Sequence, residues 1–288
     1  MRLGLLIECE EGLTWERWRL ILHVAERLQF HSVWVSDHLE SPWPEADKHG
    51  LEAWAALTFA AAQTRRIRLG SLVSPVTFRQ PAVFARTVES VHELARGRLI
   101  VGLGLGWNAA EHKNAGLPFP PIDQRALVLE RTVEVLPDVP ILIGGAGATS
   151  LHLAARFAQA WNITTASPEK FVERSTELDR YCQKHGRDPS AVERSIAVGV
   201  LVGRDAAELR SRSRRMQDVV PPLAEVALDD VPSAARERGW IVGTPREVVA
   251  TLDSLAHAGV DLAMLGYYDV DDIAGLELIA DRVMPAFV

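Results

Sequence analysis

The chain has 288 residues, 48% of them hydrophobic, and a formal net charge of −7. This length suits one large core or two modest ones, and the thinly spread Lys and Arg residues argue against a nucleic-acid partner. The tightest basic cluster, from Arg210 to Arg215, falls in a helical pattern that is typical of a solvated helix face.

The small number of cysteines and the lack of a recognisable targeting signal predict a cytoplasmic protein. Cys9 and Cys182 are the only cysteines, too few and too isolated for a disulfide framework or a zinc site. Acidic residues interrupt the first apolar run at once, unlike in a signal peptide, and no run approaches the ~18 apolar residues of a membrane span. We therefore expect no membrane partner.

Short apolar runs alternate with longer amphipathic stretches along the chain. The apolar runs predict strands over Leu3–Ile7, Ser32–Ser36, Ile67–Val73, Leu99–Gly104, Ile141–Ile143, Trp161–Thr164, Ile196–Val202 and Leu262–Leu265. The amphipathic stretches predict helices over Trp15–Leu28, Leu51–Thr64, Ala82–Leu94, Gln124–Leu136, Ala148–Phe157, Pro168–His185, Ala206–Val219, Pro245–Ala258 and Ile273–Arg282.

This alternation favours an α/β fold, a (β/α)8 TIM barrel, with a doubly wound sheet as the main rival. Because no linker-like break in composition occurs, we expect a single domain over residues 1–288. The stretch 221–239 is the least regular part of the chain, and we expect short helices there over one end of the barrel.

Asp37 and His38 directly follow the second predicted strand, where barrel enzymes place active-site side chains. A histidine at this place can donate a hydrogen bond or a proton near neutral pH, and Asp37 could orient it. A capping Asp beside a surface His is an equally weighted alternative.

Two glycine-rich segments end predicted strands. Gly102, Gly104 and Gly106 stand at alternate positions, which predicts a close approach to this backbone by a ligand or, alternatively, tight packing at a barrel corner. Residues 144–147 end a strand and open a helix, where free N–H groups and the helix dipole favour a phosphate. No Lys-Ser or Lys-Thr follows, so this is not a P-loop, and a plain turn is the equal alternative.

No metal site is expected. Glu111 and His112 fall in a predicted loop, and no second pair of ligands with suitable spacing accompanies them. A G-x-S-x-G nucleophile elbow is also missing from the sequence.

Five segments, in register, resemble the bacterial luciferase-like monooxygenase superfamily: residues 32–39, 66–86, 97–120, 140–162 and 242–261. The resemblance implies a luciferase-like (β/α)8 barrel that binds FMN or the deazaflavin coenzyme F420 at its C-terminal face. Ser36-Asp37-His38 followed by Pro42-Trp43, together with residues 70–81, look closest to the F420-dependent branch.

The resemblance also implies roles for individual residues. His38 matches the histidine beside the central ring, which makes it the candidate catalytic residue, bonding or protonating the pyrimidine edge. Leu72 and Val73 match a bulge behind the ring, where relatives have a non-prolyl cis peptide. The remaining cofactor-binding candidates are Asp37 near the ring, Asn108, and the phosphate turn of Gly144, Gly145, Gly147 and Ala148. Arg79 and Pro81 are expected to be structural.

Two departures from the family pattern concern the substrate. Trp107 replaces a glutamate of the sugar-phosphate-oxidising relatives, which argues against glucose-6-phosphate oxidation. Family members carry a long insertion before the fifth strand, and in this chain it is shortened to little more than residues 135–139. The resemblance therefore implies neither a lid over the site nor a particular substrate. Trp43 and Trp107 are candidates for an aromatic wall, whereas core packing explains Trp34 and Trp54 equally well.

The leading hypothesis is an F420-dependent oxidoreductase that transfers a hydride between the deazaflavin and a small organic substrate. The alternatives are an FMN-dependent monooxygenase supplied by a partner reductase, a non-catalytic cofactor-binding barrel, and a phosphate-binding barrel lyase or isomerase. Since many members of the superfamily are dimers, the resemblance also implies a homodimer.

Overall fold

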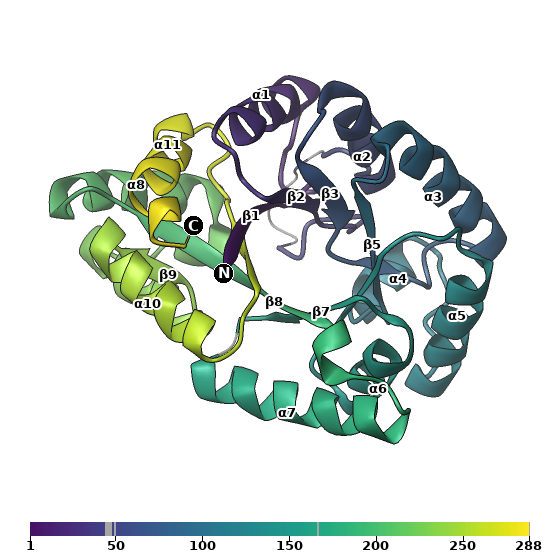
Figure 1. The fold of residues 1–288 in the computed structure, drawn as a ribbon. Coiled ribbons are helices and arrows are strands. Elements are labelled where there is room, and N and C mark those ends of the chain that lie inside the picture. Colours follow the sequence, from purple (N-terminus) through teal and green to yellow (C-terminus); the bar gives the residue numbers. More distant parts are fainter. Residues whose placement is uncertain (44–47, 49, 166, 288) are drawn as a thin grey trace.

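The computed structural model describes residues 1–43, 48, 50–165 and 167–287. Within them, eight parallel strands form a closed barrel, and the helices form a ring around it (Figure 1). The barrel strands are β1 (Arg2–Ile7), β2 (Ser32–Val35), β3 (Arg68–Ser71), β5 (Leu99–Gly104), β6 (Ile141–Gly144), β7 (Ala160–Thr164), β8 (Glu193–Val202) and β10 (Leu262–Gly266). Pairing of β10 with both β1 and β8 closes the ring. The predicted (β/α)8 barrel is confirmed.

The helices cover the outside of the barrel, as the amphipathic patterns predict. They are α1 (Trp15–Arg27), α2 (Ala53–Gln63), α3 (Pro81–Ala95), α4 (Ala109–Asn114), α5 (Ile122–Val135), α6 (Ala148–Phe157), α7 (Pro168–Lys184), α8 (Ala206–Val219), α9 (Val231–Glu237), α10 (Pro245–His257) and α11 (Ile273–Arg282). Side-chain caps fix several starts: Thr14 accepts from the N–H of Arg17, and Thr244 forms a capping box with Glu247. Helix α4 was predicted as loop, and that prediction is wrong.

The barrel interior is filled by side chains, as in other barrels of this kind. This inner cluster consists of Leu6, Trp34, Ile100, Leu142, Ala160, Ala197, Leu262 and Met264. The Trp34 ring fits inside because Gly70 has no side chain, since a Cβ at Gly70 would lie 2.3 Å from that ring. Trp34 and Trp54 are 1% and 3% exposed, so both belong to the core and not to an aromatic wall.

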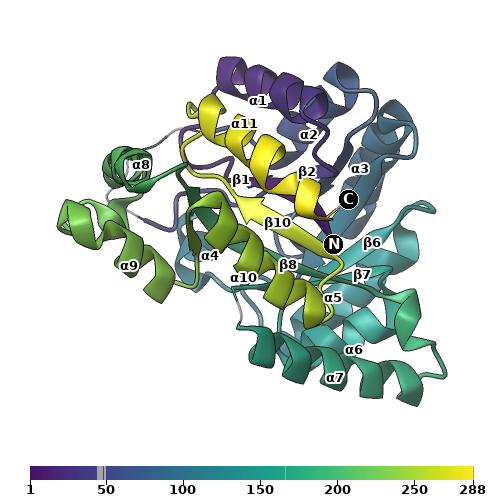
Figure 2. The same ribbon diagram turned by 60° about the vertical axis from the view of Figure 1, so that its left-hand side comes forward.

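A long excursion separates β8 from β10. It contains α8, two short 3-10 turns (Pro221–Leu223 and Leu228–Asp230), α9 and the short strand β9 (Ile241–Gly243). Figure 2 shows α8 and α9 together at one edge of the molecule. Strand β9 pairs with the carboxyl half of β8, which places the excursion at the end of the barrel where its strands finish. The short helices predicted for residues 221–239 are confirmed, whereas β9 was not predicted.

Two further connections shape this end of the barrel. The two-residue strand β4 (Ser74–Pro75) follows β3 and pairs with the last residues of β5. Helix α5 ends at Val135 and β6 starts at Ile141, so the short connection before the fifth barrel strand is confirmed. None of the helices in the described ranges is long and apolar enough to cross a bilayer.

Candidate functional site

A bulge follows β3 at the barrel mouth, where the carboxyl ends of the strands meet. The Leu72–Val73 peptide bond is cis, as the resemblance implies. A Cβ on Gly104 would lie 2.5 Å from Val73 Cγ2, and one on Gly144 would lie 3.0 Å from Val73 Cγ1. The glycines of β5 and β6 therefore make room for the Val73 side chain. The group that approaches the glycine-rich backbone of β5 is therefore the Val73 side chain of the same protein.

His38 lies just beyond the end of β2, where it meets a buried carboxylate. Its Nδ1 is 3.1 Å from each carboxylate oxygen of Glu111. Glu111 is 1% exposed and also accepts a hydrogen bond of 2.6 Å from the N–H of Leu39. The carboxylate therefore fixes the ring so that Nδ1 donates, and Nε2 has no partner within the described part of the chain.

The charges around His38 hold it protonated. Burial alone would lower its pKa, but the hydrogen bond to Glu111 and the charges of Glu10, Glu111 and Glu8 raise the pKa to about 9. Burial alone would raise the pKa of Glu111, but hydrogen bonds from His38 and Leu39 lower it. At neutral pH the pair is an imidazolium and a carboxylate, and His38 can donate from Nε2.

Asp37 is buried and forms an ion pair. Arg79 donates to both of its carboxylate oxygens, at 2.7 and 3.0 Å, and the Asp37 side chain is only 2% exposed. Arg79 also pairs with Glu52, the N-cap residue of α2. This ion pair ties the loop of His38 to α2 and to the segment before α3. The structural role expected for Arg79 agrees with this placement, whereas a direct cofactor contact by Asp37 stays a prediction that the geometry disfavours.

A second buried carboxylate, Glu10, lies after β1 and was not singled out from the sequence. Ser36 donates its hydroxyl to Oε2, while Ser36 Oγ accepts a 2.8 Å bond from the N–H of Cys9. Burial and the neighbouring charge of Glu8 raise the pKa of Glu10 well above its ordinary value. Its Oε1 has no hydrogen-bond partner among the residues described. Glu10 therefore adds a second titratable group close enough to influence His38.

The turn between β6 and α6 has the features of an anion site. Gly147 is the N-cap residue of α6, it has no side chain to cap the helix, and Gly147 and Ala148 are exposed. Gly145 has φ +122°, and a Cβ there would lie 2.7 Å from Ser150 Oγ, so only glycine fits. Trp161 Nε1 donates to the Gly145 carbonyl at 2.8 Å and holds the turn in place. The exposed N–H groups and the helix dipole suit a phosphate.

Trp107 and Asn108 lie on the loop after β5. The Trp107 ring stands edge-on to His38, with ring centroids 5.7 Å apart. Asn108 caps α4 by accepting bonds of 3.1 and 3.2 Å from the N–H groups of Ala110 and Glu111. The observed role of Asn108 is therefore to place Glu111, and its predicted cofactor contact stays a prediction.

Sequence reasoning missed Glu111 as a functional residue, although a signal was present. Asn108 followed three residues later by Glu111 is the spacing of a capping box, which marks the start of a helix. Here Glu111 uses its carboxylate on His38 and Leu39 instead of on the helix cap. The local spacing around Glu111 does not indicate its partner, His38, which lies 73 residues earlier in the chain.

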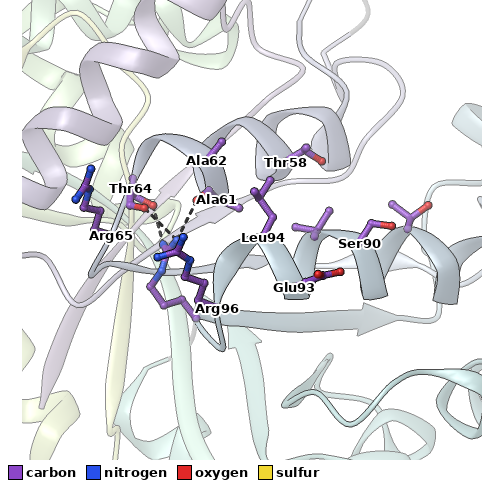
Figure 3. Close-up of a pocket in the computed structure, with 12 residues that line it drawn as sticks. Thr58, Ala61, Ala62, Thr64, Arg65, Ser90, Glu93, Leu94 and Arg96 are labelled. Carbon is purple, nitrogen blue, oxygen red and sulfur yellow. Dashed lines mark hydrogen bonds between the residues drawn. The ribbon is translucent and has the colours of Figure 1, made fainter.

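A large cavity lies away from the barrel mouth. It has a volume of about 1050 Å³ and opens between α2 and α3, with Arg65 and Arg96 at one end (Figure 3). None of the predicted site residues lines it, so the mouth is the candidate site because of its chemistry and not because of cavity size. Among the described residues, no group of three or more His, Cys, Asp or Glu side chains is arranged to hold a metal ion.

Several known proteins are similar to this chain over most of its length. An F420-dependent glucose-6-phosphate dehydrogenase of Kineococcus radiotolerans is 26% identical over 278 residues, covering 82% of each chain. An F420-dependent hydroxymycolic acid dehydrogenase of Mycobacterium tuberculosis is 25% identical and covers 93% of this chain and 84% of its own. A solved F420-dependent secondary alcohol dehydrogenase, in complex with an F420-acetone adduct, superposes with a TM-score of 0.80. It is 20% identical and covers 100% of this chain and 99% of its own, which shows the fold alone.

The family model described as luciferase-like monooxygenase matches residues 8–136 and 120–262. These ranges include both halves of the barrel, the cis peptide, His38, Glu111 and the turn before α6. The chain therefore belongs to the luciferase-like monooxygenase family.

Proposed function

We propose that this protein is an F420-dependent oxidoreductase that transfers a hydride between the deazaflavin and a small organic substrate. The observation that carries the choice of F420 is the similarity, over most of the chain, to relatives named as F420-dependent enzymes. Three features at the barrel mouth suit such a cofactor: the helix N-terminus at Gly147, the Val73 bulge and the His38 imidazolium.

The residues present fit a flat ring that carries a phosphorylated chain. The exposed N–H groups at Gly147 and Ala148 would hold the phosphate. The Val73 bulge, packed against Gly104 and Gly144, would support one face of the ring. His38 would lie at the edge of the ring, where Nε2 can donate to an atom that gains negative charge.

The protein's own part in the reaction is alignment and proton handling. When bound, the deazaflavin supplies a two-electron hydride carrier that reacts poorly with oxygen. Glu111 holds the proton on Nδ1 of His38, so that a second proton stays at Nε2 near neutral pH. Trp107 beside His38 would limit the access of water to this edge of the mouth.

An FMN-dependent monooxygenase is the second candidate. It is favoured by the family description itself, which names a monooxygenase. The phosphate turn and the bulge would serve FMN equally well, and such an enzyme would need a partner reductase to supply reduced flavin. Oxygen chemistry would then replace hydride transfer to the organic substrate.

The deciding experiment is a titration of the purified apoprotein with F420 and, separately, with FMN, followed by tryptophan fluorescence. We expect F420 to bind in the low micromolar range and FMN much more weakly. The reverse preference would support the monooxygenase, and binding of neither would refute both. Tight F420 binding without turnover in a substrate screen with reduced F420 would indicate a non-catalytic binding barrel.

We also propose that the protein is a homodimer, as many members of its family are. Light scattering coupled to gel filtration measures this directly. A mass of twice 31.7 kDa is the expected result, and a mass of 31.7 kDa at micromolar concentration would contradict it.

A further inference from the structure

Trp107 has an unusual place for a large apolar side chain. It is 68% exposed although it lies beside His38, the candidate catalytic residue. Leu39, the residue that follows His38 in the chain, is 47% exposed. Exposed apolar surface that gathers at a candidate site commonly marks a surface that a ligand covers.

The backbone on both sides of Trp107 is held firmly. Arg125 donates from Nη1 to the carbonyls of Leu105 and Gly106, and its guanidinium lies 4.1 Å above the Phe119 ring centroid. Asn108, the next residue, caps α4. The exposed ring therefore stands on a fixed loop, which lowers the entropic cost of using it as a binding surface.

A second aromatic group lies across the barrel. Tyr268 follows β10, which is four strands away from β5 around the barrel. Its ring stacks on Trp240 with centroids 4.6 Å apart, and Trp43 lies at 6.4 Å. Aromatic side chains thus lie near the strand ends on two opposite sides of the barrel, the exposed Trp107 after β5 and the Tyr268 group packed against the core of α8, α9 and β9.

Three glutamates, Glu8, Glu10 and Glu11, follow β1 at the end of the barrel where its strands finish. Burial and the charges of Glu8, Glu10 and Glu11 raise the pKa of Tyr268. Two cations that contact the loops after β1 and β2 are already paired, Lys48 with Glu11 and Arg79 with Asp37. The His38 imidazolium also carries a positive charge at the mouth, but the Glu111 carboxylate beside it offsets that charge. A substrate with a phosphate or carboxylate near its reacting carbon would therefore meet the glutamates and, among these described residues, no cation that is not already paired with a carboxylate.

We propose that Trp107 is a specificity-determining residue, and that the substrate is an uncharged, largely apolar organic compound that packs on its indole ring next to His38. This inference rests on the proposed function, since it assigns the substrate class of the same site. Anionic compounds of the same shape are rejected by the acidic β1 side.

The test uses the full chain loaded with oxidised F420 and three probes that share a phenylalkyl group. Benzylacetone is neutral, hydrocinnamate is anionic and phenethylamine is cationic. Calorimetric titration should show benzylacetone binding at least about 10-fold more tightly than hydrocinnamate, with the difference shrinking in high salt. Tighter binding of hydrocinnamate, or no binding of benzylacetone up to its solubility limit, would overturn the inference.

Variants at Trp107 separate a substrate role from a cofactor role. Trp107→Ala should weaken benzylacetone binding about 10-fold and leave F420 binding within about 2-fold, whereas Trp107→Phe should keep most of the benzylacetone affinity. The matched control is Trp15→Ala, which removes a 45% exposed tryptophan from α1 and should change neither affinity. An unchanged benzylacetone affinity in Trp107→Ala, or a loss of F420 binding instead, would refute the inference. Failure of the unmodified protein to bind F420 would refute the proposed function itself.

Discussion

Replacing Glu111 with Gln tests the central feature of the site, the proton held on His38. Glutamine keeps one acceptor oxygen and nearly the same shape but removes the charge. The pKa of His38 is raised from 6.5 to about 9, which corresponds to at most about 3 kcal/mol of preference for the charged form. Glu111 supplies both a hydrogen bond and part of the charge, so in Glu111→Gln the pKa should fall toward 6.5.

The measurement is an NMR titration of the His38 ring in protein with labelled histidine. The His38 ring should titrate near pH 9 in the unmodified protein and at a clearly lower pH in Glu111→Gln. Glu40→Gln is the matched control, because Glu40 lies two residues from His38 but bonds Asn114 instead. If His38 titrates near 6.5 in the unmodified protein and does not respond to Glu111→Gln, the reasoning about this pair is wrong.

The same pair makes stability depend on pH. Because the folded-state pKa of His38 lies above that of the unfolded chain, its contribution is fully present below about pH 6.5 and is lost as the pH rises through about 9. The lowered pKa of Glu111 acts in the opposite direction, since its contribution is present above 4.5 and is lost at lower pH. At pH 7, Glu111→Gln should cost about 2 kcal/mol in urea unfolding, and the difference should shrink above pH 9.

Substitutions at Gly104, Gly147 and the Arg79–Asp37 pair probe the frame of the candidate site. Gly104→Ala places a Cβ 2.5 Å from Val73 Cγ2 and should cost about 1–3 kcal/mol in urea unfolding, whereas Gly147→Ala, with nothing within 4 Å, should unfold like the parent. Gly147→Asp adds a good helix cap but puts a carboxylate at the proposed phosphate turn. It should therefore raise the melting temperature while weakening F420 binding, and equal F420 affinity would contradict a phosphate at this turn. Arg79→Ala leaves the buried Asp37 carboxylate unpaired and should lower the free energy of unfolding by about 3–5 kcal/mol. Adding Asp37→Asn to the same chain should restore most of that loss. If the effects of the two substitutions simply add, the pair is not coupled.

The strands and most of the helices could be predicted because their signals are local. Parallel strands covered by helices must be apolar on both faces, so each of the eight barrel strands appears as a short apolar run. Exceptions are short elements whose stability comes from neighbours. Strand β9 forms because β8 offers it an edge, and α4 spans only six residues that Asn108 caps. Both elements are too short for a hydrophobic pattern to reveal them.

In the candidate site, too, local features could be predicted and contacts between distant segments could not. The resemblance located His38, the cis peptide and the turn at Gly144–Gly147, since each lies in a contiguous segment. The contacts that give these residues their chemistry join distant segments: Glu111 with His38, Arg79 with Asp37, and the glycines of β5 with Val73. No periodicity or spacing within one segment carries such pairings.

The amino-acid sequence by itself determined the barrel, through the alternation of apolar runs and amphipathic stretches, and it predicted the candidate site at the strand ends. Only the tertiary structure decided which ionisable groups share the mouth and therefore which are charged. The physical reason is that hydrophobic periodicity is a property of neighbouring residues, whereas a pKa depends on burial and on charges within a few ångströms, whatever their separation along the chain.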